Sequence, residues 1–235
     1  ELGDGQVLTP ISLSATINDL ALQPDGKIVA VGSSQNYNGG PTDLALARYN
    51  ADGSLDTTFG TGGKLITSLT EYSDGGFSVI VQPDGKIVIG GYGGEHYTDS
   101  DPLDFALVRY LPDGSLDTSF ATNGVVLLPP LAGANRWGFD LALQPDGKIL
   151  FGGAQLVRFL SDGSLDATFG HNGQLAPVTD GSRTKIALQP DGKILVAGNT
   201  VGTNHDFALE RYNRDGSLDT SFATSGKLTL DIQGY

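Results

Sequence analysis

The sequence contains no cysteine and no methionine, and it has a single tryptophan among 235 residues. Without cysteine the chain forms no disulfide bonds, uses no thiol chemistry and builds no cysteine-based zinc site. It also lacks any run of about 18 apolar residues, so we expect no membrane insertion. The absence of both readily oxidised side chains fits an extracellular or cell-surface location. Because the chain starts at Glu1 and not at methionine, we expect a processed or trimmed piece.

Positive charge is scarce as well. Fourteen Lys and Arg residues stand against 27 Asp and Glu residues, giving a formal net charge of −13 and a pI near 4.3. A field of this sign opposes phosphate backbones and anionic lipids, so we expect no nucleic acid partner. It attracts divalent cations, which leaves calcium as the one candidate cofactor. The spacing of an EF-hand calcium loop is absent, and we assign no metal ligands.

Glycine and internal repetition are abundant. The motif QPDGKI occurs four times, and a second motif of Arg, an aromatic residue, DGSLD and Phe follows each copy. The first motif begins at Gln23, Gln82, Gln144 and Gln189, and the second at Arg48, Arg109, Arg158 and Arg211. Successive QPDGKI copies lie 59, 62 and 45 residues apart. Repetition at this period predicts stacked units, either a propeller or a solenoid.

Each copy reads as four short strands. In the first copy the apolar runs are residues 19–23, 27–32, 43–49 and 64–67. Pro24-Asp25-Gly26 separates the first two runs, with a proline suited to the second position of a type I turn and a glycine that accepts positive φ. The same turn chemistry follows the third run. The pattern therefore predicts four antiparallel strands in each copy.

The strands are apolar on both faces. In residues 43–49, Leu44 and Leu46 point one way, whereas Ala45 and Ala47 point the other. A sheet with one wetted face would alternate apolar and polar residues, so these sheets need a cover on each side. Blades packed against one another supply that cover. We therefore predict an all-β protein, a β-propeller of four-stranded antiparallel blades that forms a single domain over residues 1–235.

The strand motif QPDGKI(V/L) followed by Arg-Tyr and DGSLDTSFG resembles the delta-60 repeat family of bacterial β-propeller repeats. The resemblance covers essentially the whole chain. It implies a β-propeller fold. That family is mostly of unknown function with surface or secreted association, so the resemblance implies an extracellular or cell-surface location and says little about chemistry.

Residues present in all four copies serve the blade, because a catalytic group is normally needed once. Asp56 and its equivalents are interpreted as caps of the turn before Phe59, paired to Arg48 and its equivalents. The alternative is four cation-binding sites. The repeated phenylalanines are interpreted as plugs between neighbouring sheets, with an aromatic ligand platform as the alternative.

Differences between copies point to a binding face. The first and third loops of each copy are nearly invariant, while the second loop and the crossover to the next copy vary. The second loop is expected at residues 33–42 in the first copy and at residues 90–103 in the second. These variable segments share one side of a propeller, where binding residues concentrate. Aromatic, amide and carboxylate groups there are typical of sugar and peptide sites, so a protein or a glycan is the expected partner. The candidate ligand-binding residues are Tyr37, Tyr92, His96, Tyr97, Arg136 and Trp137.

Two of these candidates have other interpretations. Trp137 could simply cover the edge of a blade. His96 lies beside Glu95, Asp99 and Asp101, a set that could bind a cation, although polar glycine-rich loops produce such clusters by chance. The remaining histidines, His171 and His205, belong to no triad or metal pair.

No catalytic residue is assigned, because no nucleophile elbow, phosphate loop, zinc-protease or dinucleotide motif is present. We therefore expect a non-enzymatic secreted or cell-surface module for binding or adhesion. The alternatives are a hydrolase or lyase acting on polysaccharide, and a self-assembling extracellular structural subunit that exchanges terminal strands.

The outer-strand segment occurs five times, once more than the other three strand types. It recurs at residues 6–9, 64–67, 125–128, 174–177 and 227–230. The surplus strand could close the ring, belong to a neighbouring blade of a longer array, or pair with another copy of the protein, since an unpaired edge templates strand addition. We hypothesise ring closure within one chain, with a homo-oligomer formed through the terminal strands as the alternative.

Overall fold

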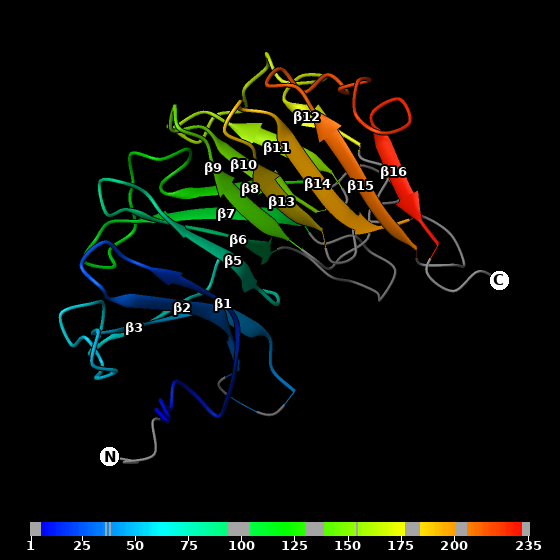
Figure 1. The fold of residues 1–235 in the computed structure, drawn as a ribbon. Helices are drawn as coiled ribbons and strands as arrows, with labels where there is room; N and C mark the ends of the chain where they lie inside the picture. The colour runs from blue at the N-terminus through cyan, green and yellow to red at the C-terminus, as the bar shows by residue number, and fades with distance from the viewer. Residues whose placement is uncertain are drawn as a thin grey trace. The chain divides into compact units, whose positions relative to one another are not determined.

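The computed structural model describes residues 6–35, 37, 39–93, 104–129, 139–153, 155–176, 184–200 and 206–231. Within these ranges the chain forms β-strands and no helix, and so contains no helical segment that could cross a membrane (Figure 1). The strands belong to two compact units, Glu1–Leu128 and Pro129–Tyr235.

Unit 1, Glu1–Leu128, holds two antiparallel sheets of four strands, each with its strands side by side in chain order. Sheet 1 consists of β1 (Ser14–Leu22), β2 (Ile28–Gln35), β3 (Thr42–Tyr49) and β4 (Lys64–Thr67). Sheet 2 consists of β5 (Gly75–Val81), β6 (Ile87–Gly93), β7 (Asp104–Tyr110) and β8 (Val125–Leu128).

Unit 2, Pro129–Tyr235, repeats this arrangement with two further sheets. Sheet 3 consists of β9 (Asp140–Leu143), β10 (Ile149–Gly152), β11 (Leu156–Phe159) and β12 (Gln174–Leu175). Sheet 4 consists of β13 (Lys185–Leu188), β14 (Ile194–Asn199), β15 (Phe207–Tyr212) and β16 (Lys227–Leu230). The prediction of four antiparallel strands in each copy is confirmed.

The Pro-Asp-Gly turns have the predicted geometry. The Gly26 amide donates to the Gln23 carbonyl at 2.9 Å, and the Gln23 amide donates to the Lys27 carbonyl at 2.8 Å. Gly26 has φ of 83°, a left-handed conformation that glycine adopts without strain. The Asp25 carboxylate accepts the Lys27 amide at 3.2 Å, which fixes the turn further.

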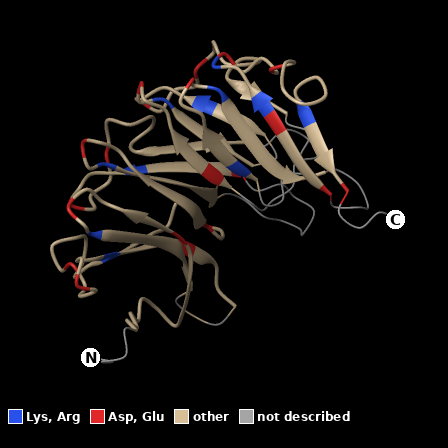
Figure 2. Ribbon diagram, in the orientation of Figure 1, with Lys and Arg blue, Asp and Glu red and all other residues tan. Residues whose placement is uncertain are grey.

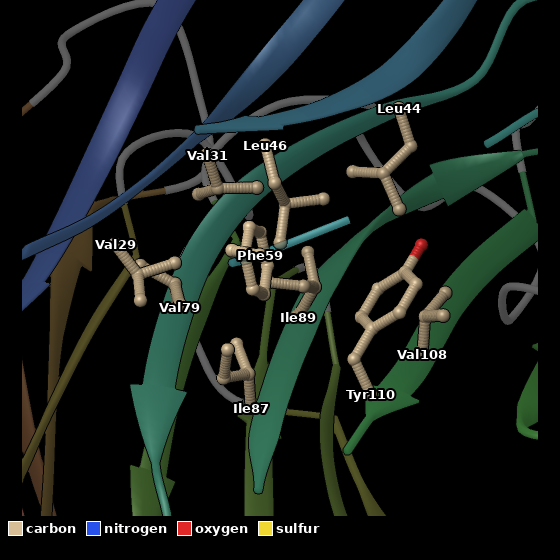
Figure 3. Packing of buried hydrophobic residues seen from close by; sticks show 10 residues of the cluster. All are labelled: Val29, Val31, Leu44, Leu46, Phe59, Val79, Ile87, Ile89, Val108 and Tyr110. Atoms are coloured by element: carbon tan, nitrogen blue, oxygen red, sulfur yellow. The ribbon is translucent and has the colours of Figure 1, made fainter. Parts of the chain in front are cut away.

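The core of unit 1 lies between sheets 1 and 2. Val29, Val31, Leu44 and Leu46 cover the side of sheet 1 that meets sheet 2 (Figure 3). We call this side of a sheet, which packs against the next sheet, its forward face, and the opposite side its rear face. On the rear face of sheet 2, the packing residues are Val79, Val81, Ile87, Ile89, Val108 and Tyr110.

Phe59 packs in the same core and is fully buried, which confirms its interpretation as a plug between sheets. In unit 2, Leu150, Leu156 and Phe169 of sheet 3 pack in the same way. Their partners on the rear face of sheet 4 are Ile186, Leu188, Ile194, Val196 and Tyr212.

Two loop boundaries differ from the sequence interpretation. Residues 33–42 and 90–103 were expected to be loops, but β2 continues to Gln35 and β6 continues to Gly93. The extension of β6 depends on glycine, since a Cβ at Gly91 would lie 1.9 Å from the Gly75 carbonyl oxygen. Polar and glycine-rich residues therefore pair here as strands because the backbone, and not an apolar side chain, makes the contact.

The outer-strand segments are confirmed at β4, β8 and β16, whereas the surplus segment 6–9 forms no strand in the structure. Only Gln6 within it takes part in an isolated bridge. The fourth segment is shorter than predicted, since β12 ends at Leu175 and residues from 177 lie outside the described ranges.

Candidate functional site

Each sheet carries the same ionic cluster next to its Asp-Gly-Ser turn. In sheet 1 the Arg48 Nε donates to Asp56 Oδ2 at 2.7 Å, and Lys27 Nζ lies 3.1 Å from the same oxygen. The other oxygen, Oδ1, accepts the Thr58 hydroxyl at 2.6 Å. The Arg48 guanidinium lies over the Phe59 ring, 4.5 Å from its centroid, a cation–π arrangement. Asp56 is thus a buried carboxylate held by two cations and a hydroxyl.

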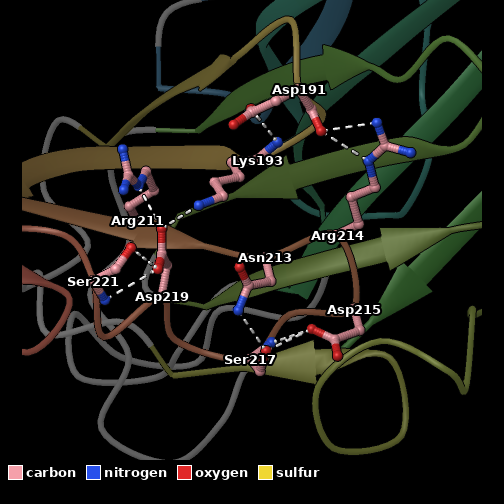
Figure 4. A network of polar contacts seen from close by, with 9 residues as sticks. All are labelled: Asp191, Lys193, Arg211, Asn213, Arg214, Asp215, Ser217, Asp219 and Ser221. Atoms are coloured by element: carbon pink, nitrogen blue, oxygen red, sulfur yellow. Dashed lines mark hydrogen bonds and ion pairs between the residues drawn. The ribbon is translucent and has the colours of Figure 1, made fainter.

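The other three copies repeat this geometry. The Arg–Asp distance is 2.8 Å in sheets 2 and 3 and 2.7 Å in sheet 4. Figure 4 shows the version in sheet 4, where Asp219 accepts from Arg211, Lys193 and Ser221. The predicted pairing of the repeated arginines and aspartates is confirmed. The cluster members are Arg48, Asp56 and Lys27; Arg109, Asp117 and Lys86; Arg158, Asp166 and Lys148; and Arg211, Asp219 and Lys193.

The clusters stabilise the ionised carboxylates. For Asp56 the largest cause is the hydrogen bond from the Thr58 hydroxyl, which together with Lys27 and Arg48 holds the pKa far below its usual range. Burial raises the pKa of Asp117, but the hydrogen bonds from Ser119 and the charges of Arg109 and Lys86 outweigh it and lower the pKa to about 2. Groups so fully engaged with one another act as parts of the framework.

The loops that differ between copies lie at the other ends of the strands. We call this end of each sheet the variable edge, and in unit 1 it includes the β2–β3 loop and the β4–β5 crossover. The Thr42 hydroxyl donates to the Asp74 carbonyl at 2.9 Å, and the Asp74 amide donates to the Thr42 carbonyl at 2.6 Å. The Thr42 amide also donates to the Ser73 hydroxyl at 3.2 Å. These bonds bring the loop and the crossover together, as the sequence interpretation predicted.

Asp74 anchors the crossover. Its side chain is fully buried, and Oδ2 accepts the backbone amides of Leu69 at 2.7 Å and Thr70 at 2.9 Å. Burial raises the pKa of this carboxyl despite these hydrogen bonds. Sequence reasoning did not single out Asp74. Its one available signal was that it lies in a crossover and has no counterpart at the same position in the other copies.

Of the six candidate ligand-binding residues, Tyr37 and Tyr92 lie in the described part of the chain. Tyr37 is exposed in the β2–β3 loop. Tyr92 lies on β6 and is half-buried, with its ring 5.6 Å from that of Phe77 and its hydroxyl 3.4 Å from the Thr42 hydroxyl. Both belong to the variable edge of unit 1. His96, Tyr97, Arg136 and Trp137 lie outside the described residues, as do Glu95, Asp99, Asp101 and His205.

Acidic groups are widespread on the strand-joining turns (Figure 2), yet they do not form a metal centre in the described ranges. In those ranges no three or more His, Asp or Glu side chains lie close enough together to hold a metal ion. His171, which the sequence linked to no triad, lies in the turn before β12 and bonds to Gln174 through its backbone.

A buried glutamate is the other residue that sequence reasoning missed. Glu210 on β15 is almost fully buried; it accepts the Tyr212 hydroxyl at 2.5 Å and lies 3.1 Å from Lys227 Nζ. Burial and the neighbouring Glu210 raise the pKa of Tyr212. The signal was present, since Glu210 occupies the strand position where the other copies have Ala47, Val108 and Val157.

Four-stranded antiparallel sheets that repeat along the chain and pack face to face define the class of β-propellers. The family described as "Domain of unknown function (DUF5122) beta-propeller" matches residues 23–59, 82–120, 144–169 and 189–222. The match spans more than half of the chain and includes both motifs of every copy. This chain belongs to that family, which confirms the predicted fold class.

Several solved structures share the fold. A protein of unknown function from Dyadobacter fermentans is 12% identical with a TM-score of 0.54, over 86% of this chain and 67% of that one. An exo-β-1,3-galactanase from Clostridium thermocellum is 12% identical with a TM-score of 0.51, over 97% and 49%. A DUF4623 family protein from Bacteroides eggerthii is 13% identical with a TM-score of 0.50, over 93% and 48%.

The present chain therefore spans about half the length of the last two proteins. At these identities the likeness is one of fold alone. No curated protein matches the sequence.

Proposed function

We propose that this β-propeller, of the delta-60 type, is a non-enzymatic binding module of the bacterial cell surface or of the secreted fraction, and that its variable edge recognises a protein or a glycan. The observation that carries the proposal is the contrast between the two edges. One edge keeps the same ionic cluster and the same turns in all four sheets. The other presents loops that differ in length and sequence.

Rigid support beneath variable loops is the arrangement of many recognition surfaces. In unit 1 the support is specific, since Thr42 and the buried Asp74 fix where the loop and the crossover leave the sheets. Exposed Tyr37 then offers an aromatic ring with a polar tip, the type of side chain that binds sugars and peptides at low entropic cost.

The test is a binding screen of the purified chain against bacterial glycans and against peptides. The affinity of variants of this chain for the best ligand is then measured. Tyr37→Ala, and replacement of residues 94–103 by the three-residue sequence Gly-Ala-Gln of the third copy, should each weaken binding tenfold or more. The thermal midpoint should stay within about 3 °C of that of the parent chain. Asp84→Ala on the invariant edge is the matched control and should bind normally.

Loop variants that bind like the parent would contradict the proposal. Turnover of a polysaccharide with a pH dependence, abolished by one acidic substitution at the variable edge, would favour the hydrolase or lyase alternative instead. The fold shared with a galactanase makes polysaccharides the first substrates to assay.

A further inference from the structure

A cavity of about 410 Å3 lies between the Pro-Asp-Gly turns of sheets 3 and 4. Its apolar lining comes from both sheets and consists of Leu143, Pro145, Leu188 and Pro190. The volume falls in the range of about 300–1,000 Å3 that is usual for pockets that bind small ligands. Every residue of the lining belongs to unit 2, so the cavity is formed by two sheets that pack directly on each other.

Gln144 brings an unpaired polar group to this cavity. The glutamine lines the cavity and is 8% exposed, and its Oε1 atom accepts no hydrogen bond within the described ranges. A buried acceptor without a donor is unfavourable, because it has lost its hydrogen bonds to water and gained none in return. Since no hydrogen bond to a described residue holds the carboxamide, rotation about its last torsion, which is soft, can turn Oε1 toward a ligand.

Arg214 distinguishes this cavity from its counterparts. The glutamine oxygen is unpaired in the other three copies as well, at Gln23, Gln82 and Gln189. The residue before the Asp-Gly-Ser turn, in contrast, is basic in the fourth copy alone. At the position of Arg214 the other copies have uncharged residues, Ala51, Pro112 and Ser161. The combination of the unpaired carboxamide with a cation is therefore specific to the contact between sheets 3 and 4.

The Arg214 guanidinium has no acidic partner among the described residues. Its Nε and Nη2 donate to the Asp191 carbonyl oxygen at 3.0 and 2.8 Å, and Figure 4 shows the third nitrogen pointing away from Asp191. The chain has 27 acidic and 14 basic side chains, so carboxylates are not scarce. A cation that none of them pairs with, beside a cavity, indicates an anionic group in the ligand.

The backbone fixes Arg214 beside the cavity. Its carbonyl accepts from the Arg158 Nη1, and the next carbonyl, that of Asp215, accepts the Gly170 amide at 2.9 Å, which fastens this turn to sheet 3. A Cβ at Gly192 would lie 2.1 Å from Arg214 Nε, so the glycine leaves the space in which the arginine lies across its turn. A group held in place before binding loses little entropy when the ligand arrives.

We propose that this cavity binds the C-terminal end of a peptide whose last residue is apolar. The terminal carboxylate accepts a charge-assisted hydrogen bond from Arg214, and the N–H of the last residue donates to Gln144 Oε1. The apolar side chain packs among the leucines and prolines of the lining. Capture of a terminal carboxylate is a recurring mode of peptide recognition. The cavity lies at the invariant turns, so this inference does not depend on the ligand of the variable edge.

The lining favours a peptide over an acidic sugar. Sugar sites typically include aromatic side chains, whereas the described lining contains leucine and proline and no aromatic residue. The lining also contains one carboxylate, that of Asp146. Its side chain is 59% exposed and lies 3.9 Å from Lys148 Nζ, so water and the lysine reduce its repulsion of an anion.

The test is isothermal titration calorimetry of the purified chain with the tripeptide acetyl-Gly-Gly-Leu, both as the free acid and as the C-terminal amide. The free acid should bind at a single site with a Kd on the order of 0.1–1 mM, as expected for a ligand of this size. The amide should bind at least tenfold more weakly, because it lacks the charge that Arg214 recognises. Acetyl-Gly-Gly-Gly as the free acid should also bind at least tenfold more weakly, because it lacks the apolar side chain.

Two variants address the polar groups. Arg214→Ser gives the turn the residue of the third copy and should weaken binding of the free acid tenfold or more, with little effect on the amide. Gln144→Leu removes the acceptor and should weaken both. Gln23→Leu is the matched control, because it makes the same change in sheet 1 and should leave binding unchanged. Circular dichroism should show that all three variants fold, since Arg214 is exposed and the glutamine oxygens have no hydrogen bond to lose.

Equal affinity of the free acid and the amide would overturn the proposal, as would unchanged affinity of Arg214→Ser. An equal loss for Gln23→Leu and Gln144→Leu would also overturn it, since the ligand would then not distinguish the two copies. Glucuronate is the third ligand, and its binding in place of both leucine peptides would indicate an acidic-sugar site instead. Absence of binding of the free acid up to about 10 mM would likewise refute the proposal.

Discussion

At the scale of single residues, the buried aspartates of the ionic clusters are positions where a substitution should strongly reduce the stability of the fold. Each such carboxylate has two cations and at least one hydroxyl within hydrogen-bonding distance, so its charge is compensated although water is largely absent. Removing one partner of a buried ion pair leaves an uncompensated charge, which costs far more than the pair contributes in net terms. The clusters are therefore sensitive to truncation on either side.

Sheet 2 offers a matched pair for this test, because Lys86 lies 3.3 Å from the buried Asp117 and 3.5 Å from the exposed Asp84. Asp117→Ala leaves the buried Arg109 without its carboxylate and should lower the free energy of unfolding by about 3–5 kcal/mol. Asp84→Ala removes an exposed carboxylate that accepts the Lys86 amide at 3.2 Å, and it should lower the free energy of unfolding by about 1 kcal/mol or less. Urea denaturation of both variants measures the difference, and equal losses would show that Asp117 contributes nothing special.

The same aspartate predicts acid sensitivity. Asp117 has a pKa of about 2 in the folded protein, below the value of about 3.9 of an unfolded aspartate. The unfolded state therefore binds more protons in this interval, so the stabilisation is complete above about pH 5 and is lost as the pH falls toward 2. Thermal midpoints measured from pH 6 to pH 2 should fall, and Asp117→Asn should show a shallower fall.

Asp74 supplies a control, because its contribution to the pH dependence of stability has the opposite sign. Burial raises the pKa of its carboxyl, so folding takes up a proton there and is favoured as the pH falls. Asp74→Asn removes this contribution and should steepen the acid-induced fall of the midpoint. An identical pH profile for Asp117→Asn and Asp74→Asn would refute both assignments.

At the scale of strands and turns, glycine decides where two backbones approach each other. At Gly32 on β2 a Cβ would lie 1.8 Å from the Thr16 carbonyl oxygen, next to the bulge between Ile17 and Asp19. At Gly62 the surroundings are open within 4 Å, and the only obstacle is its φ of 59°. The first glycine is required by contact and the second by conformation.

Alanine substitutions separate these two requirements. Gly32→Ala should cost about 3 kcal/mol or more, because a backbone carbonyl cannot rotate away and β1 must shift. Gly62→Ala should cost about 1–2 kcal/mol, the penalty of a left-handed alanine. Chemical denaturation of the two variants measures both values, and a smaller loss for Gly32→Ala would contradict the pairing of β1 with β2.

The sequence predicted the elements well where apolar alternation continued and less well where it stopped. β4 begins and ends at the expected residues, whereas β2 runs on through Ser33 and Ser34 to Gln35. Polar residues extend a strand here because the partner strand β1 continues beside them through Ser14. A pattern of apolar residues contains no information about such pairing between backbones.

At the scale of the whole molecule, the net charge of −13 makes the acidic groups of the folded chain repel one another. Salt shortens the range of the repulsion from about 30 Å at 0.01 M to about 3 Å at 1 M and leaves apolar contacts in place.

The thermal midpoint should therefore rise between about 20 and about 500 mM sodium chloride, because the Debye length falls from roughly 20 Å to roughly 4 Å over this range. Thermal denaturation in the two buffers measures the shift. A lower midpoint at high salt would mean that screening of the ion pairs outweighs screening of the repulsion.

The sequence by itself determined the repeating unit of this protein. Turn residues and two-faced apolar strands act over a few neighbours, so four copies of QPDGKI and DGSLD suffice to predict four sheets and the pairing of Arg48 with Asp56. Tertiary structure alone decided how residues outside the repeated motifs are placed. Asp74 in the β4–β5 crossover is fully buried and accepts two backbone amides, and Glu210 on β15 is buried beside Tyr212. Burial depends on neighbours that are distant in sequence, and a repeated motif contains no information about them.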